Sequence, residues 1–492
     1  MNFVLFANLS LWLTPVWVLS VGVTIGMAVL LVLYGLLWVV ARPAAEAVAR
    51  VVRESVLMPL TYLAAVFVGF CLLGAPAMPT TLLMHSLQRL PAVGPISKTV
   101  TIPSGKDDVS VPILFRADEL QRYAFESDHA LIVNIKKGVA YSSPLIQVGA
   151  DEPYVWTPSS NRPRIFEGTV PELFVTNTGA KDAKLTINLL TDVEMPEVHQ
   201  IPITAISVVS VFLIYFLIYW LLPGISAIAV ATAKEAVAQP LYILVLLGVG
   251  CALVGFIYIP YNTFGEDVKM LKDSGLTTIM VFAILVGLWT ASVSVADEIE
   301  GKTAVTLLSK PISRREFVIG KFVGIVWALF LMFVVLGAIL LVVVSYKIVY
   351  DARETSNPEP NWQQCYAAMI GTVPGLVLAF METVVLTAIS VAISTRLPML
   401  PNLIICGSIY VLGHLGPLIV QSSAGQIEFV AFIGKLIAVV LPVLDHFNVQ
   451  AAVAGGVDVP LVYLGWALLY CVLYSTAAML LALILFEDRD LA

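Results

Sequence analysis

The chain has 492 residues, of which 59% are hydrophobic and 12% are charged, and its formal net charge is −7. Soluble domains carry roughly 25% charged residues, so this composition excludes a water-soluble globule, a disordered chain and a small disulfide scaffold. The five cysteines contain no CxxC pair, and we therefore expect neither a disulfide nor a metal site. Because no basic face is present, nucleic acid is not an expected partner.

Nine segments are long and apolar enough to cross a bilayer, which takes about 20 residues each. They are 14–41, 58–76, 201–222, 240–260, 276–296, 322–346, 366–394, 402–420 and 460–486. The sequence thus predicts an α-helical polytopic membrane protein with about nine transmembrane helices. A further apolar segment, 429–441, is shorter and contains Lys435. We interpret it as re-entrant or interfacial, with a full span as the alternative.

The distribution of Lys and Arg predicts the orientation in the plasma (cytoplasmic) membrane. No Lys or Arg precedes Arg42, so the first span lacks the basic region of a cleavable signal peptide. In a nine-span topology the inner loops hold eleven Lys and Arg, against five in the short outer loops. The positive-inside rule then places the N-terminus and residues 77–200 outside and the C-terminus in the cytoplasm.

Residues 77–200 form a soluble block between the second and third spans. From about residue 97 the pattern changes to short β-type runs, such as 99–102, 109–115, 130–135, 173–177 and 183–190, separated by turn signals. This spacing predicts an inserted extracytoplasmic β-sandwich, and the runs 175–179 and 183–187 suggest a late hairpin of an immunoglobulin-like (Ig-like) domain. Its role is open between a lid or partner-docking module and a substrate-binding domain.

Two segments of the chain are similar at an offset of 181 residues, namely 53–69 and 234–250. Glu54 corresponds to Glu235, and Pro59 to Pro240, where a proline in the first turn of a span loses no hydrogen bond. The similarity predicts a repeated elbow helix followed by a span. Chance similarity between two apolar segments is the alternative.

The loop 297–321 between the fifth and sixth spans is the most informative stretch. It contains three acids, then an apolar helical face at 303–308, then a Lys-Pro break at 310–311. Ser313 is followed three residues later by Glu316, which predicts a capping box. We expect a short helix along the membrane surface that fits a groove of a cytosolic partner. The alternative is an ordinary solvated loop.

Residues 298–317 resemble the coupling region of type-2 ABC transporter permeases (the ABC-2 family). The segments 441–448 and 486–491 and the run Gly413-His-Leu-Gly are also similar to this family. The resemblance covers about residues 225–492, which would form a six-span permease core with the coupling loop 297–321. The preceding parts would then be a two-span N-terminal region (1–76), the β domain (77–200) and a third span (201–224).

The resemblance implies the membrane subunit of an ATP-driven transporter, an exporter, paired with a second permease subunit as a homo- or heterodimer. A separate cytosolic ABC ATPase would bind ATP and magnesium, since this chain contains no GxxxxGK[ST] motif and is not expected to be an enzyme. The residues expected to couple to the ATPase are Asp297, Glu298, Glu300, Gly301, Lys302, Thr303, Leu307, Leu308, Lys310, Pro311, Arg314, Arg315 and Glu316, with Glu235 and Pro240 in the elbow. Arg314 and Arg315 are expected at lipid phosphates or at the acidic rim of the partner.

Two ionisable residues, Glu382 and His414, lie deep in predicted spans. Each is about 18 Å from the cytoplasmic end of its span at 1.5 Å per residue, so neighbouring antiparallel helices would bring them together. An acid in hydrocarbon is costly and needs a partner or a cavity. The pair either ties two helices together or marks a substrate or proton path, unless the two positions are unrelated.

Three other functions are alternatives to the permease. An intramembrane protease is disfavoured, because the HExxH and GxGD motifs are absent. A secondary transporter driven by Glu382 would need no ATPase. The main alternative is a non-transporting receptor or assembly scaffold that uses the outer β domain. The substrate is not revealed by the sequence.

Overall fold

The computed structural model describes residues 2–138, 146–150, 152–158, 160, 162, 164–259, 261, 266–296, 298, 313–355, 358–421, 432 and 441–487, with backbone alone for 2–10 and 416–421. The chain divides into two compact units. One is helical and comprises Met1–Gly74 and Ile203–Ala492, and the other is Ala75–Pro202.

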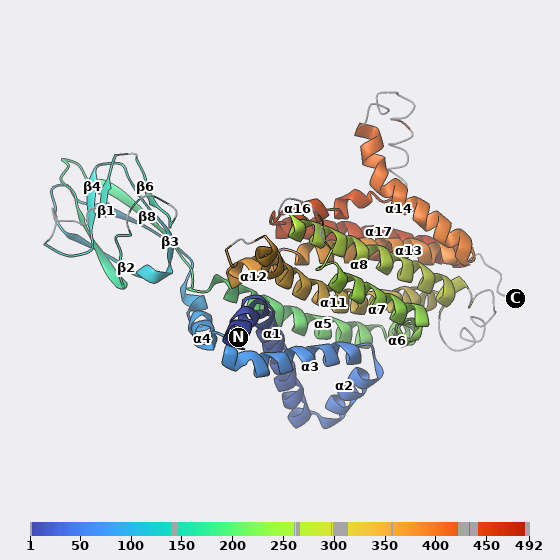
Figure 1. The fold of residues 1–492 in the computed structure, drawn as a ribbon. Helices are drawn as coiled ribbons and strands as arrows, with labels where there is room; N and C mark the ends of the chain where they lie inside the picture. Colours follow the sequence, from blue (N-terminus) through green and yellow to red (C-terminus); the bar gives the residue numbers. More distant parts are fainter. Residues whose placement is uncertain are drawn as a thin grey trace. The chain divides into compact units, whose positions relative to one another are not determined.

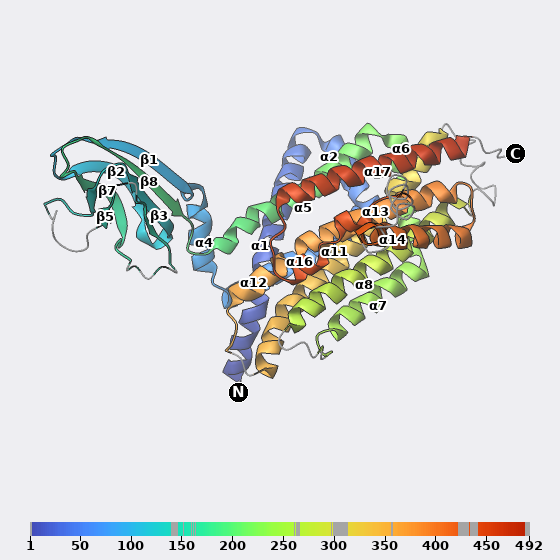
Figure 2. The same ribbon diagram turned by 90° about the horizontal axis from the view of Figure 1, so that it is seen from above.

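The helical unit is built from apolar helices of very different lengths. In chain order they are α1 (Asn2–Val40), α2 (Arg42–Glu54), α3 (Leu57–Gly74), α5 (Gln200–Leu221), α6 (Pro223–Ala238), α7 (Pro240–Gly255), α8 (Asp267–Ala291), the π-helical η5 (Ser292–Ala296), α11 (Arg314–Glu354), α12 (Trp362–Ile370), α13 (Val373–Ser394), α14 (Met399–Gln421), η7 (Leu444–Phe447), α16 (Gln450–Ala454) and α17 (Leu461–Glu487). Helices α7, α8, α11 and α13 run side by side (Figures 1 and 2) and bury a common hydrophobic core.

The described residues contain seven helices that are long and apolar enough to cross a membrane, or eight if the bent pair α6–α7 is one span. The protein is thus a multi-pass membrane protein, but the count of nine is not confirmed. The predicted span 240–260 is the 16-residue helix α7, which is too short alone and follows a 60° bend. The predicted span 402–420 lies in α14, whose described apolar part is Met399–Leu415. The segment 429–441 lies outside the described residues, apart from 432 and 441.

The second unit contains α4 (Thr80–Arg89) and a β region. Its strands are β1 (Pro95–Ile102), β2 (Val109–Arg116), β3 (Leu120–Ser127), β4 (Leu131–Asn134), β5 (Ile146–Val148), β6 (Tyr154–Trp156), β7 (Thr169–Thr176) and β8 (Ala183–Thr191). They form two four-stranded antiparallel sheets, in the orders β1-β8-β3-β6 and β2-β7-β4-β5. Side chains alternate between the core and solvent along β8, and both sheets contribute to one core.

The strand order corrects two details of the predicted β-sandwich. In an Ig-like domain the first strand pairs with the second, whereas β1 here pairs with β8. The order is that of an eight-stranded jelly roll, so the Ig-like topology is not confirmed. The expected late hairpin is also wrong, because β7 and β8 are consecutive but lie in different sheets. Alternation of apolar residues predicts strands, but does not determine which strands pair.

Candidate functional site

The predicted elbow is a bend between two helices. Helix α6 ends at Ala238, Gln239 is extended, and Pro240 is the first residue of α7, with a 60° change of direction. Proline fits there because the first turn of a helix has no carbonyl partner for its missing N–H. Helices α2 and α3 repeat the pattern, since they break at 55–56. The internal similarity therefore corresponds to a repeated helix–break–helix unit.

Helix α6 packs closely against the first turns of α11. Two glycines on α11, Gly320 and Gly324, form the contact in a G-x-x-x-G arrangement. A Cβ added at Gly324 would lie 2.6 Å from the carbonyl oxygen of Ala229, and one at Gly320 would lie 2.7 Å from Cβ of Ile228. Glycine at both positions lets the two backbones approach, as in close helix pairs of membrane proteins. The elbow helix is thus held directly on α11.

Lys321 lies between these two glycines in sequence and is almost fully buried. Its Nζ is 2.6 Å from Oε1 of Glu298, at the beginning of the predicted coupling loop, and 3.9 Å from Oε2 of Glu235 in the elbow helix. The lysine thus joins three segments: α6, α11 and the residues after η5. Lys321 is not among the site residues predicted from the sequence. The signal was present, because an ionisable residue inside an apolar helix needs a partner.

The end of the loop is fixed by the predicted capping box, which is confirmed. The backbone N–H of Glu316 donates to Oγ of Ser313 (3.2 Å), and the backbone N–H of Ser313 donates to Oε2 of Glu316 (2.8 Å). The box does not begin a separate short helix. It begins α11 itself, so the predicted span 322–346 starts eight residues earlier, at Arg314.

Arg314 reaches the end of another helix. Its Nη1 donates to the backbone carbonyl of Glu487 at 2.9 Å, in the last turn of α17, where a cation is favoured by the helix dipole. Next to this contact, the rings of Phe317 and Phe486 are stacked with their centroids 5.8 Å apart. This contact was not expected from the sequence. Arg315 is exposed, and its expected contact with lipid or a partner stays a prediction.

Most of the loop itself lies outside the described residues. This concerns the predicted coupling residues Asp297, Glu300, Gly301, Lys302, Thr303, Leu307, Leu308, Lys310 and Pro311. The structure describes the two ends of the loop, at Glu298 and from Ser313 onward, and these ends are held by Lys321 and by the capping box.

A buried polar cluster holds the segment that leads into the loop. The side-chain nitrogen of Asn402 in α14 lies 2.9 Å from Oγ of Ser292, the first residue of η5. It also lies 2.8 Å and 3.0 Å from the hydroxyls of Ser390 and Ser394 in α13, and its oxygen accepts from Cys406. π-Helical turns are rare in proteins, and those that occur often lie at functional sites. Asn402 is not among the site residues predicted from the sequence, although its polarity next to an apolar segment is a signal for a buried polar contact.

The structure brings Glu382 and His414 together. Nε2 of His414 lies 3.5 Å from Oε1 of Glu382, and its Nδ1 lies 3.1 Å from the carbonyl oxygen of Tyr410. Glu382 is buried in α13, whereas His414 is partly exposed in α14. The contact links two neighbouring helices inside the apolar core. Whether the pair also serves a substrate or proton path stays a prediction.

In the part of the chain that the structure describes, no group of three or more His, Cys, Asp and Glu side chains is arranged to hold a metal ion. The arrangement above suits a mechanical role, since hydrogen bonds and ion pairs connect the two ends of one loop to three helices, α6, α11 and α17.

Comparison with known proteins places this region in context. Residues 260–491 match the model of a family described as ABC-2 family transporter protein. A search of curated proteins found no match. The matched part includes the whole loop, α8 and the helices from α11 to α17, but not α1–α7 or the β unit. The chain is thus a multi-pass membrane protein whose residues 260–491 are similar to ABC-2 family transporters, and this similarity supports a role as a transport permease.

Proposed function

We propose that this chain is the membrane-spanning permease subunit of an ATP-driven transporter that works as an exporter. It couples a separate cytosolic ABC ATPase to the movement of a substrate across the membrane. The observation that carries the proposal is the match of residues 260–491 to the ABC-2 family, because this stretch contains the coupling loop 297–321. In this assignment the loop faces the cytoplasm.

The contacts at both ends of the loop support this function. Glu298 at its start is bound to Lys321 of α11, and the capping box at its end is part of α11. Through Glu235 and Arg314, the same region also reaches α6 and α17. A displacement of the loop by an ATPase would therefore act on several spans together, because the contacting side chains form a continuous network from the loop to these helices.

Binding and hydrolysis of ATP are assigned to the partner. The sequence has no GxxxxGK[ST] loop to hold the phosphates. The transporter would contain two permease subunits, identical or different, and two ATPase subunits.

A pull-down of the tagged chain in mild detergent tests the proposal. We expect an ABC ATPase to co-purify, and its hydrolysis of ATP to be stimulated by the reconstituted chain. A monodisperse preparation that binds no such ATPase would refute the permease assignment and favour the receptor or scaffold function.

The contribution of the loop can be measured with one pair of variants. Lys321→Met removes the cation that binds Glu298 and Glu235 but keeps the length and apolar stem of the side chain. We expect the ATPase still to bind, while stimulated hydrolysis falls to the basal level. The exposed Lys234 of the same elbow helix provides the control, since Lys234→Met should leave stimulation unchanged. Equal stimulation in both variants would contradict a coupling role for this ion pair.

A further inference from the structure

An apolar groove of about 200 Å³ lies in the helical unit, between α3, α5 and α11. Leu60 and Ala64 of α3, Val211 and Phe212 of α5, and Phe330 of α11 line it. The small side chain of Ala64 forms part of its wall, and Val23 of α1 also lines it. Helices α3 and α5 lie outside the part of the chain that matches the ABC-2 family.

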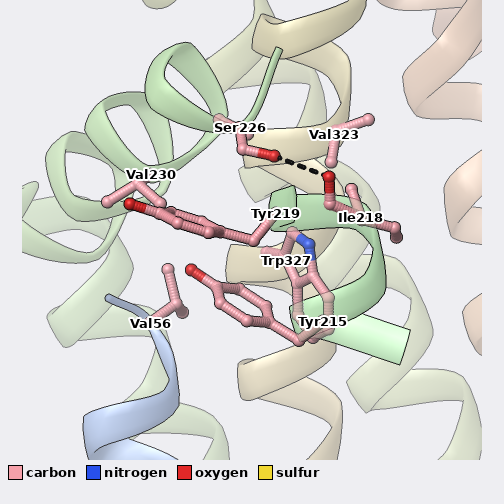
Figure 3. Close-up of a pocket in the computed structure, with 9 residues that line it drawn as sticks. Val56, Tyr215, Ile218, Tyr219, Ser226, Val230, Val323 and Trp327 are labelled. Atoms are coloured by element: carbon pink, nitrogen blue, oxygen red, sulfur yellow. Dashed lines mark hydrogen bonds between the residues drawn. The ribbon is translucent and has the colours of Figure 1, made fainter. Parts of the chain in front are cut away.

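The space next to the groove is closed by aromatic side chains (Figure 3). Tyr215 and Tyr219 of α5 and Trp327 of α11 face one another there, beside Val56 at the α2–α3 break. The cavity that remains is about 10 Å³, which is room for about one water molecule. The groove itself is lined by apolar side chains except for one serine, Ser207.

The position of the groove determines which medium fills it. Leu60 is about 5 Å of helix rise from the start of α3 and Phe67 about 15 Å, which is the hydrocarbon depth of the leaflet next to α2. The neighbouring side chains Val66 and Ile214 are 67% and 53% exposed, so they contact hydrocarbon in the membrane. Water does not fill an apolar cavity, and an empty one would lose dispersion contacts. A lipid acyl chain supplies those contacts.

The exposed arginines of helix α2 favour a lipid with an anionic headgroup. Helix α2 is amphipathic, with Val51 buried in the same hydrophobic cluster as Tyr215 and with Arg50 and Arg53 exposed beside Glu46 and Glu54. Its three arginines and two glutamates leave a net charge of +1 on this helix. At the first residue of α2, the guanidinium of Arg42 lies 4.6 Å from the ring centre of Trp38, and Trp is typical of the membrane interface. A helix of this kind lies in the headgroup region, where arginines attract anionic lipids.

We propose that the groove between α3, α5 and α11 binds an acyl chain of an anionic phospholipid from the leaflet adjacent to α2, with the headgroup at Arg50 and Arg53. The site is independent of the ATPase and would give the helices added before the ABC-2 region a function of their own: they build a lipid site against α11.

Native mass spectrometry of the full chain, purified in mild detergent and supplied with defined phospholipids, tests the acyl-chain site. Ala64→Phe should fill the groove and abolish retained phospholipid. The adjacent Ala65 is exposed on the other face of α3, so Ala65→Phe adds the same bulk outside the groove and should leave retention unchanged. If Ala64→Phe does not fold, Ala64→Leu provides a smaller filling. Retention that survives filling of the groove, or that is lost equally in the Ala65 control, would overturn the proposal.

A competition between phosphatidylglycerol and phosphatidylcholine tests the headgroup. We expect the wild-type chain to prefer the anionic lipid, and this preference to fall by roughly fivefold for each arginine removed in Arg50→Gln and Arg53→Gln. Arg396→Gln removes an exposed arginine elsewhere in the helical unit and should not change the preference. Equal binding of both lipids by the wild-type chain would refute the anionic class.

Discussion

The two ends of α11 each carry a buried lysine, and the two lysines are held in different ways. Lys321 and Lys347 lie about 39 Å apart along the helix at 1.5 Å per residue. Their side chains are 5% and 0% exposed, and each has two carboxylates within 4 Å. An isolated charge would not be stable at either place, so both sites depend on their partners.

Lys347 is paired with a carboxylate of its own helix and with groups at the adjoining ends of α7 and α8. Asp351, one turn further along α11, is at 2.8 Å, and the carbonyl oxygen of Ile257 at the end of α7 is at 2.9 Å. Asp267, the first residue of α8, is at 3.9 Å. This arrangement fixes the ends of α7 and α8 on α11.

Lys321, in contrast, depends on acids from two other segments. Glu235 is 45% exposed, whereas Glu298 is 21% exposed, much like Asp267 (21%) and Asp351 (19%) at the other lysine. We call the Lys347 end of α11 the clamp, because one of its acids belongs to α11 itself, and the Lys321 end the joint, because both of its acids come from other segments.

The largest effect is expected at the clamp. Lys347→Met leaves two carboxylates and a carbonyl oxygen without their cation, which should destabilise the protein by about 3 kcal/mol. Thermal unfolding in the same detergent measures the loss. Lys269→Met is the matched control, because Lys269 forms an exposed pair with Glu266 at 2.6 Å and should change stability by less than about 1 kcal/mol. Similar losses of stability in both variants would show that the burial of Lys347 does not increase the cost of removing its charge.

A smaller effect is expected where the elbow helix meets the joint. Gly324→Ala places a Cβ against the carbonyl oxygen of Ala229 and should cost about 1–3 kcal/mol by separating α6 from α11. Gly248→Ala in α7 meets no atom within 4 Å. It should stabilise the helix by up to about 1 kcal/mol, because alanine is the better helix former. If Gly324→Ala is equally harmless in thermal unfolding, the close approach is not required.

The smallest effect concerns an ion pair of the β unit whose acid can titrate. Arg89 of α4 binds Glu119 through two hydrogen bonds of 2.8 Å, and these bonds lower the pKa of the Glu119 carboxyl. Because the carboxyl has a lower pKa in the folded chain than in the unfolded chain, its ionised form stabilises the fold at pH values above the pKa of the unfolded chain. This stabilisation is lost as the pH falls through the pKa of the folded chain. Arg89→Gln should remove about 1 kcal/mol at neutral pH and flatten the acid dependence.

Hydrogen exchange of β3 in the full chain, corrected for the intrinsic pH dependence of exchange, measures this change. Arg122→Gln removes an exposed arginine on β3 itself and should leave the acid dependence as in the wild type. An unaltered profile in Arg89→Gln would assign the acid dependence to other groups.

Local patterns in the sequence predicted those parts of the structure that depend on neighbouring residues. The capping box needs only Ser313 and Glu316, and the elbow needs only Pro240 after a polar segment. The β region was found from alternating side chains. The span count was not confirmed, because apolar length alone does not show that α7 follows a 60° bend.

The sequence by itself determined the membrane class, the resemblance of residues 298–317 to ABC-2 permeases and the matched depth of Glu382 and His414. The first and third follow from composition and helical rise, and the resemblance follows from the order of residues in one short segment, all of which are local quantities. Only the tertiary structure decided that Lys321 joins Glu298 to Glu235, that Arg314 binds the end of α17 and that β1 pairs with β8. Such contacts join residues far apart in the chain, and many pairings satisfy the same pattern of polar and apolar residues.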